Sequence, residues 1–162
     1  MKNGGFSLIE LVIAVALVGV LSTIVTPKVR AQLAKGKDTK AVAYLASMRT
    51  ASELYYLDNN KSPLEGEETE ETIKKAIENI LPYLDPKAEK ELEDGKIEIG
   101  GSRKAAVSGT AEEDIQYGGE INFTFKNPDN SSAVKEDGVY IWFNPQNIGE
   151  YDTTGKNKWI EY

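Results

Sequence analysis

The stretch FSLIELVIAVALVGVLSTIVT, residues 6–26, decides the fold of the amino-terminal part of this 162-residue chain. Glu10 is its only charged residue. As a helix with a rise of about 1.5 Å per residue it extends for about 31 Å, which matches the hydrocarbon core of a bilayer. A charge near the centre of such a helix costs roughly 2.5–3.5 kcal/mol, so Glu10 needs a partner or a function.

The composition excludes several functional classes. The chain has no cysteine and no histidine, so disulfides, thiolate or imidazole metal sites and catalysis by a histidine base are ruled out. A net charge of −7 argues against binding to nucleic-acid phosphates, and we expect no sequence-specific nucleic-acid partner. We therefore expect one domain with a membrane segment, and not an enzyme.

Three interpretations of the amino terminus compete. A secretory signal peptide fits poorly, because the apolar run exceeds the usual length of about 7–15 residues and Val29-Arg30-Ala31 is a weak cleavage site. An ordinary membrane anchor would leave Glu10 at the lipid headgroups. The third interpretation is cleavage between Gly5 and Phe6, which leaves the apolar helix at the new amino terminus.

The sequence GFSLIELVIAVALVGVLSTIVTP, residues 5–27, resembles the class III signal of type IV pilins and of type II secretion pseudopilins. The residues that carry this resemblance are Gly5, Phe6, Glu10, the unbroken apolar stretch and Pro27. The resemblance implies that a prepilin peptidase cuts between Gly5 and Phe6 and methylates the new amine of Phe6. It also implies that Glu10 of one subunit faces the Phe6 amine of a neighbour in an assembled fibre.

The same resemblance implies a structural subunit of a type IV pilus-like fibre that polymerises through this helix. It would be a single-pass protein of the bacterial inner membrane with an exported head, and afterwards part of a cell-surface or periplasmic fibre. Its partners would be like subunits, the prepilin peptidase, an inner-membrane assembly platform and membrane lipid. Two alternatives stay open, the major pseudopilin of a type II secretion system and a membrane-anchored binding module that never polymerises.

One observation conflicts with this topology. Lys2 is the only basic residue before the apolar run, whereas several follow it closely: Lys28, Arg30, Lys35, Lys37 and Lys40. The positive-inside rule would place the following domain in the cytoplasm, and the resemblance places it outside. A topology reporter fused after Tyr162 distinguishes the two.

We predict an α+β protein, with a long helical spine packed on a small antiparallel sheet as in pilins. Residues 1–5 form the leader, 6–27 the membrane and polymerisation helix, 28–58 its amphipathic continuation and 59–162 the head. One helix is expected from about Ser7 to Leu57, kinked or loosened at Pro27 and Gly36. An apolar stripe with helical spacing would pack on the sheet: Ala41, Leu45, Met48, Ser52 and Tyr55.

The head begins with helices and continues with strands. Ile73, Ile77, Ile80 and Leu81 have helical spacing, and Asp85-Pro86 is typical of the start of another short helix. Period-two patterns then predict four strands: one around Ile97 and Ile99, one over 120–126, one over 138–143, and a last one ending at Trp159-Ile160. Residues 100–114 are expected to form a flexible surface stretch.

Acidic residues near the carboxyl-terminal strands suggest a cation site. Asp137, Glu150 and Asp152 could supply carboxylate ligands to calcium, and the pseudopilin resemblance implies calcium in a loop of this region. Their spacing fits no fixed motif, so exposed turn residues are the alternative. No other cofactor is expected.

Overall fold

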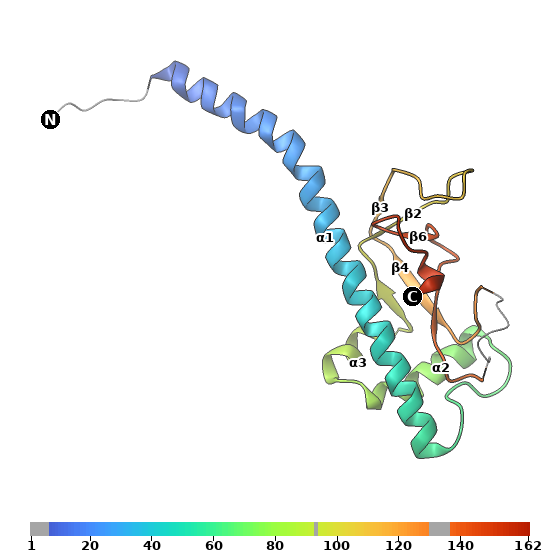
Figure 1. The fold of residues 1–162 in the computed structure, drawn as a ribbon. Coiled ribbons are helices and arrows are strands. Elements are labelled where there is room, and N and C mark those ends of the chain that lie inside the picture. The colour runs from blue at the N-terminus through green and yellow to red at the C-terminus, as the bar shows by residue number, and fades with distance from the viewer. Residues whose placement is uncertain (1–6, 93, 130–136) are drawn as a thin grey trace. The chain divides into compact units, whose positions relative to one another are not determined.

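The structure is a computed structural model that describes residues 7–92, 94–129 and 137–162. The chain divides into two units, residues 1–33 and 34–162. Helix α1 (Leu8–Asn59) begins in the first unit and continues into the second (Figure 1). The prediction of one helix from about Ser7 to Leu57 is therefore confirmed. The chain stays helical through Pro27 and Gly36, and a kink at these residues stays a prediction.

Two asparagines end α1. The Asn59 side chain donates to the carbonyl of Tyr55 at 3.0 Å, and the backbone N–H of Asn60 donates to the carbonyl of Tyr56 at 2.8 Å. Asn60 adopts a left-handed conformation with φ of 51°, which asparagine tolerates better than most residues. The chain can therefore turn away from the helix axis at this point.

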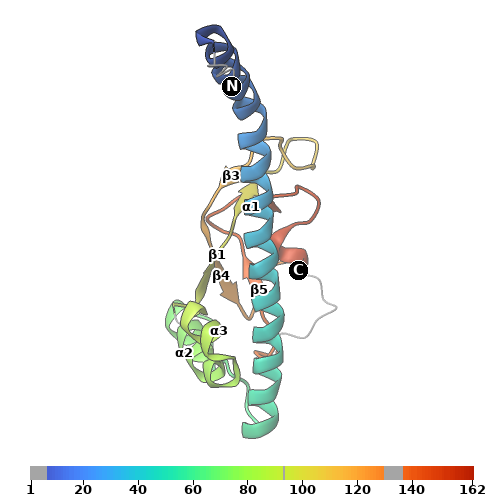
Figure 2. The ribbon, with the colours of Figure 1, turned by 90° about the vertical axis from the view of Figure 1, so that its left-hand side faces the viewer.

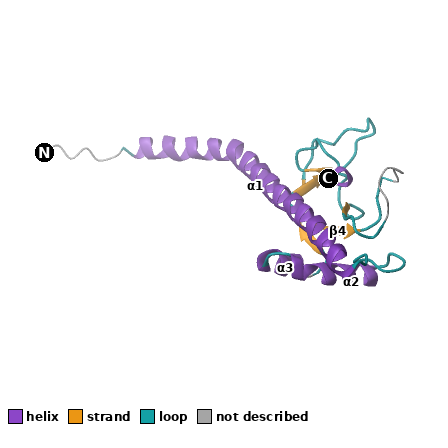
Figure 3. Cartoon of the chain, turned by 60° about the horizontal axis from the view of Figure 1, so that its bottom comes forward, coloured by secondary structure: helices purple, strands orange, loops and turns teal. Residues whose placement is uncertain are grey.

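Two further helices follow, α2 (Glu70–Ile80) and α3 (Pro86–Leu92), with a 3-10 turn η1 (Leu81–Tyr83) between them. Thr69 caps α2, since its hydroxyl accepts from the backbone N–H of Thr72 at 3.2 Å. Both predicted helices are confirmed. Figure 3 shows α2 and α3 together, beside the last part of α1.

Asp85 and Pro86 start α3 as the sequence predicted. The Asp85 carboxylate accepts from the backbone N–H groups of Lys87 at 3.0 Å and Ala88 at 3.2 Å. Pro86 takes the first helical position, where its missing N–H costs nothing because that donor would have no partner within the helix.

The strands form two antiparallel sheets of three strands each, where the sequence predicted one sheet. The first has the order β1-β4-β5, and Figure 2 shows α1 passing over it. The second has the order β3-β2-β6. The strand bounds are β1 (Lys96–Glu98), β2 (Gly101–Arg103), β3 (Gln116–Tyr117), β4 (Glu120–Thr124), β5 (Trp142–Asn144) and β6 (Tyr151–Asp152).

The core lies between the second half of α1 and the first sheet. Ile121 and Phe123 alternate with exposed residues along β4, as predicted, and Phe123 stacks on Phe143 of β5 with ring centroids 5.7 Å apart. From α1, Leu45 and Met48 join the same buried cluster. Because all of these side chains are about 1% exposed or less, this core holds the helix to the sheet.

Three predictions for the strand region of the head need correction. Residues 100–114 are not simply a flexible surface stretch, because Gly101–Arg103 forms the central strand of the second sheet. Of the predicted strand over 138–143 only Trp142 and Phe143 pair with a neighbour, and the observed strand extends one residue further, to Asn144. Trp159–Glu161 forms a 3-10 turn in place of the predicted last strand, and the buried Trp159 ring packs edge-on against Phe143.

Candidate functional site

The first unit presents an unburied apolar helix. From Leu8 to Val25 its large apolar side chains are 51–81% exposed, and it is the one helix among the described residues that is long and apolar enough to cross a membrane. Soluble proteins rarely leave such an apolar surface in water, so these side chains need lipid or other helices around them.

Hydroxyl groups inside this segment bond back to their own helix. The side chains of Ser22, Thr23 and Thr26 each donate to a carbonyl three or four residues earlier, at 2.7 Å in all three cases. These hydroxyls therefore carry no unsatisfied donor into an apolar environment. Pro27 follows at once and lies inside the helix, where it lacks the N–H of other residues.

Glu10 lies in the first turn of α1 and is exposed. Its Oε2 accepts from the backbone N–H of Ser7 at 2.8 Å, and the hydroxyl of Ser7 accepts from the N–H of Ile9 at 3.4 Å. Gly5 and Phe6 lie outside the described residues, so cleavage and methylation there stay predictions from the sequence. So does a role of Pro27 in assembly.

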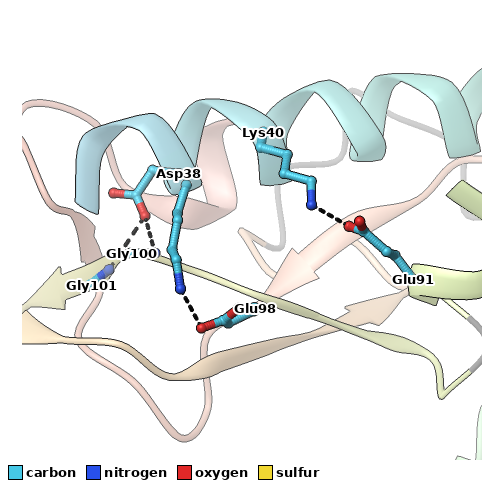
Figure 4. A network of polar contacts seen from close by, with 7 residues as sticks. Asp38, Lys40, Glu91, Glu98, Gly100 and Gly101 are labelled. Carbon is cyan, nitrogen blue, oxygen red and sulfur yellow. Dashed lines mark hydrogen bonds and ion pairs between the residues drawn. The ribbon is translucent and has the colours of Figure 1, made fainter. Parts of the chain in front are cut away.

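In the second unit, the α1 residue Asp38 makes polar contacts with backbone groups in and beside strands β2 and β6. Its Oδ1 accepts from the backbone N–H groups of Gly100 at 2.8 Å and Gly101 at 3.4 Å (Figure 4). Its Oδ2 accepts from the backbone N–H of Thr153 at 2.9 Å. Asp38 is 5% exposed, and this burial raises the pKa of its carboxyl group, an effect that the hydrogen bonds offset only in part.

Gly100 makes this attachment sterically feasible. A Cβ atom on Gly100 would lie 1.8 Å from the carbonyl oxygen of Ala34, so the strand can approach α1 only with glycine at this position. Two exposed ion pairs flank the contact, Lys37–Glu98 and Lys40–Glu91 (Figure 4). The hydrogen bond from Lys40 lowers the pKa of Glu91.

Sequence analysis missed Asp38, although a signal was present. The residue falls at helical spacing between Ala34 and Ala41, on the face that continues into Leu45 and Met48. An acid on the buried stripe of an amphipathic helix indicates that a fixed donor lies opposite it.

The three predicted calcium ligands do not form one cluster. Among the residues that the structure describes, no three carboxylates approach closely enough to share a metal ion. Asp137 accepts from the backbone N–H of Val139, and Glu150 lies 3.8 Å from the Lys158 amine. The described residues thus give no support for a shared site, and calcium binding by Asp137, Glu150 and Asp152 stays a prediction from the sequence.

Asp152 has a structural role instead. Its carboxylate accepts from the hydroxyls of Thr154 and Tyr162, each at 2.6 Å. Burial acts to raise the pKa of Asp152, but these hydrogen bonds and two backbone donors outweigh it and lower that pKa overall. Burial and the bond to Asp152 raise the pKa of Tyr162 to about 12.

The fold and the amino-terminal segment together define a class, an α+β protein with a long apolar helix at its amino-terminal end. Over residues 1–26 the chain matches the family described as the prokaryotic N-terminal methylation motif. The predicted resemblance to type IV pilins and type II secretion pseudopilins is thereby confirmed at the level of sequence.

The similar proteins include components of type II secretion systems and of type IV pili. The type II secretion system core protein G of Pectobacterium carotovorum is 31% identical over 96 residues, which cover 59% of this chain and 58% of that protein. The type IV wide pilus major component PilA4 of Thermus thermophilus is 38% identical over 61 residues, which cover 37% of this chain and 47% of that protein. The matches thus span about half the length of these relatives. No solved structure matches the chain.

Proposed function

We propose that this chain is a structural subunit of a type IV pilus-like fibre, and that it polymerises by burying the apolar segment of α1 against the same segment of other copies. The unburied helix carries this proposal, because an apolar surface of this length needs a membrane before assembly and neighbouring helices after it. The methylation motif over residues 1–26 and the pilus component among the relatives support it.

The proposal includes processing and location. A prepilin peptidase removes residues 1–5 and methylates the amine of Phe6, while the head is exported from the inner membrane. In the fibre, Glu10 then neutralises the Phe6 amine of a neighbouring subunit. An inner-membrane assembly platform would supply the work of extracting the helix from lipid, since lipid solvates apolar side chains as well as a helix bundle does.

The second candidate is the major pseudopilin of a type II secretion system. The specific observation in its favour is the 31% identity to a core protein G over 96 residues. Deleting the gene in its source organism separates the two functions. Loss of surface fibres with secretion intact supports the pilus, whereas retention of normally secreted proteins inside the cell supports the pseudopilus.

Two measurements test the proposal itself. Mass spectrometry of the mature protein is expected to find an amino terminus at N-methylated Phe6. Glu10→Ala is expected to abolish fibres and leave membrane insertion intact, with Glu53→Ala, an exposed acid later in α1, as the matched control. Fibres at the wild-type level in Glu10→Ala would refute the role of Glu10, and retention of residues 1–5 would refute the processing step.

A further inference from the structure

Two basic residues directly follow the apolar segment of α1. Lys28 and Arg30 come two and four residues after Thr26, and both are exposed. No acidic residue lies between Glu10 and Asp38 in the sequence, so the helix offers neither of them an acidic neighbour within one turn. The chain as a whole has a net charge of −7, which makes this positive pair, here called the basic collar, an exception.

Two later lysines of α1 are used differently. Lys37 pairs with Glu98 and Lys40 pairs with Glu91, so these lysines contact the head. The basic collar precedes both ion pairs and belongs to the unit of residues 1–33, which also contains the apolar segment. Its function is therefore to be sought in the surroundings of that segment.

The length of the apolar run places the basic collar at a membrane surface. Residues 6–26 extend for about 31 Å as a helix, which is about the thickness of the hydrocarbon core. Measured along the helix, Lys28 then lies about 3 Å and Arg30 about 6 Å beyond that core. The headgroup layer is about 5–8 Å thick on each side, so both residues fall within it when the run spans the bilayer.

The two residues of the collar lie on different sides of the helix. A rotation of about 100° per residue separates Lys28 from Arg30 by about 200°. A protein partner would contact one side of the helix and meet one of the two charges. A layer of lipid headgroups surrounds the helix and meets both, and anionic headgroups attract basic residues next to a membrane span. The placement thus favours lipid over a protein surface.

We propose that the basic collar binds the phosphate groups of anionic phospholipids and so fixes the depth of the apolar segment in the bilayer. The inference rests on the part of the proposed function that places this segment in a membrane, and it is independent of fibre formation. Lipid binding gives Lys28 and Arg30 a function on whichever side of the membrane the head lies. Their position therefore does not by itself place the head in the cytoplasm.

Lipid selectivity next to the helix tests the proposal. The full chain is reconstituted in phosphatidylcholine vesicles with a trace of spin-labelled phosphatidylglycerol or spin-labelled phosphatidylcholine, and electron paramagnetic resonance measures the fraction of label that the protein immobilises. We expect the anionic lipid to be preferred at least about fivefold, the factor for one basic residue near the surface. Raising the salt from about 0.1 M to 1 M shortens the screening length from about 10 Å to 3 Å and should weaken this preference.

The double variant Lys28→Gln/Arg30→Gln removes both charges and keeps polar side chains. We expect it to associate equally with the two lipids. The matched control is Lys74→Gln/Lys75→Gln, which makes the same change in net charge at two exposed residues of α2 and should keep the wild-type preference. Equal association of the two lipids with the wild type, or a preference that the collar variant retains, would overturn the proposal.

Further outcomes separate this inference from the proposed function. A wild-type chain that alkaline carbonate extracts from the vesicles would refute both the lipid site and the membrane location. A chain that stays in the membrane without selecting phosphatidylglycerol would refute the lipid site alone. Loss of fibres in the collar variant, without lipid selectivity in the wild type, would assign the collar to an acidic protein partner and overturn the proposal.

Discussion

Replacing Asp38 with alanine should detach the second sheet from α1. The change leaves the buried N–H groups of Gly100 and Thr153 without their acceptor, and these are the two short bonds, at 2.8 and 2.9 Å. An unsatisfied buried donor costs about 1–3 kcal/mol, so two cost about 2–6 kcal/mol. The variant also no longer bears the cost of desolvating the Asp38 carboxylate, which offsets part of this loss. We therefore expect the free energy of unfolding to fall by about 2–4 kcal/mol in total.

The assay is urea unfolding of the full chain in detergent, followed by tryptophan fluorescence. Trp142 and Trp159 are both buried in the second unit, so their emission reports on the head and not on the apolar helix. The urea concentration at the midpoint of unfolding should fall, while the slope of the unfolding free energy against urea concentration stays unchanged. This is the pattern of a loss of stability without a change in the surface exposed on unfolding.

Glu98→Ala is the matched control. It removes one acid close to Asp38 in the fold, but its ion pair with Lys37 joins side chains that are 66% and 52% exposed. Exposed pairs contribute about 0–1 kcal/mol, so this variant should unfold close to the wild type. If Asp38→Ala also falls within about 0.5 kcal/mol of the wild type, the attachment argued from these hydrogen bonds is refuted, because that loss is smaller than the cost of one unsatisfied buried donor.

Three further predictions concern the same unit. Gly100→Ala should destabilise the head by at least about 3 kcal/mol in the same assay, because its Cβ would overlap the Ala34 carbonyl, whereas Gly36→Ala, with open space around it, should gain about 0.5–1 kcal/mol. The lowered pKa of Asp152 stabilises the folded state above the ordinary value of 3.8, so the stability advantage of wild type over Asp152→Asn should shrink as the pH falls below 3.8. The raised pKa of Tyr162 means that its neutral form stabilises the fold and that this contribution is lost as the pH rises from 10 toward 12. The difference in tyrosinate absorbance between the wild type and Tyr162→Phe should therefore titrate with a midpoint near 12.

Each of these has a contradicting result. A Gly100→Ala protein as stable as Gly36→Ala would mean that the strand can move away from α1 at little cost. A stability advantage over Asp152→Asn that grows in acid would mean that burial, and not hydrogen bonding, controls that carboxyl group. A Tyr162 midpoint near 10 would mean that its bond to Asp152 is absent in solution.

The amino-acid sequence by itself determined the helices and the amino-terminal signal. Local features fix these: an unbroken apolar run, the Asn59-Asn60 helix end, the Asp85-Pro86 start, and the glutamate that follows Phe6. Each of these features is read from a few neighbouring residues, because helix capping and helical periodicity are short-range effects.

Only the tertiary structure decided how the strands pair and what Asp38 does. The strands of the second sheet are two or three residues long, too short to show an alternating pattern, and their partners lie far apart in the chain. Asp38 meets donors 62 and 115 residues away, and Gly100 is needed only because α1 passes against it. Such contacts depend on which surfaces meet after folding, and the sequence around one residue does not identify its distant partner.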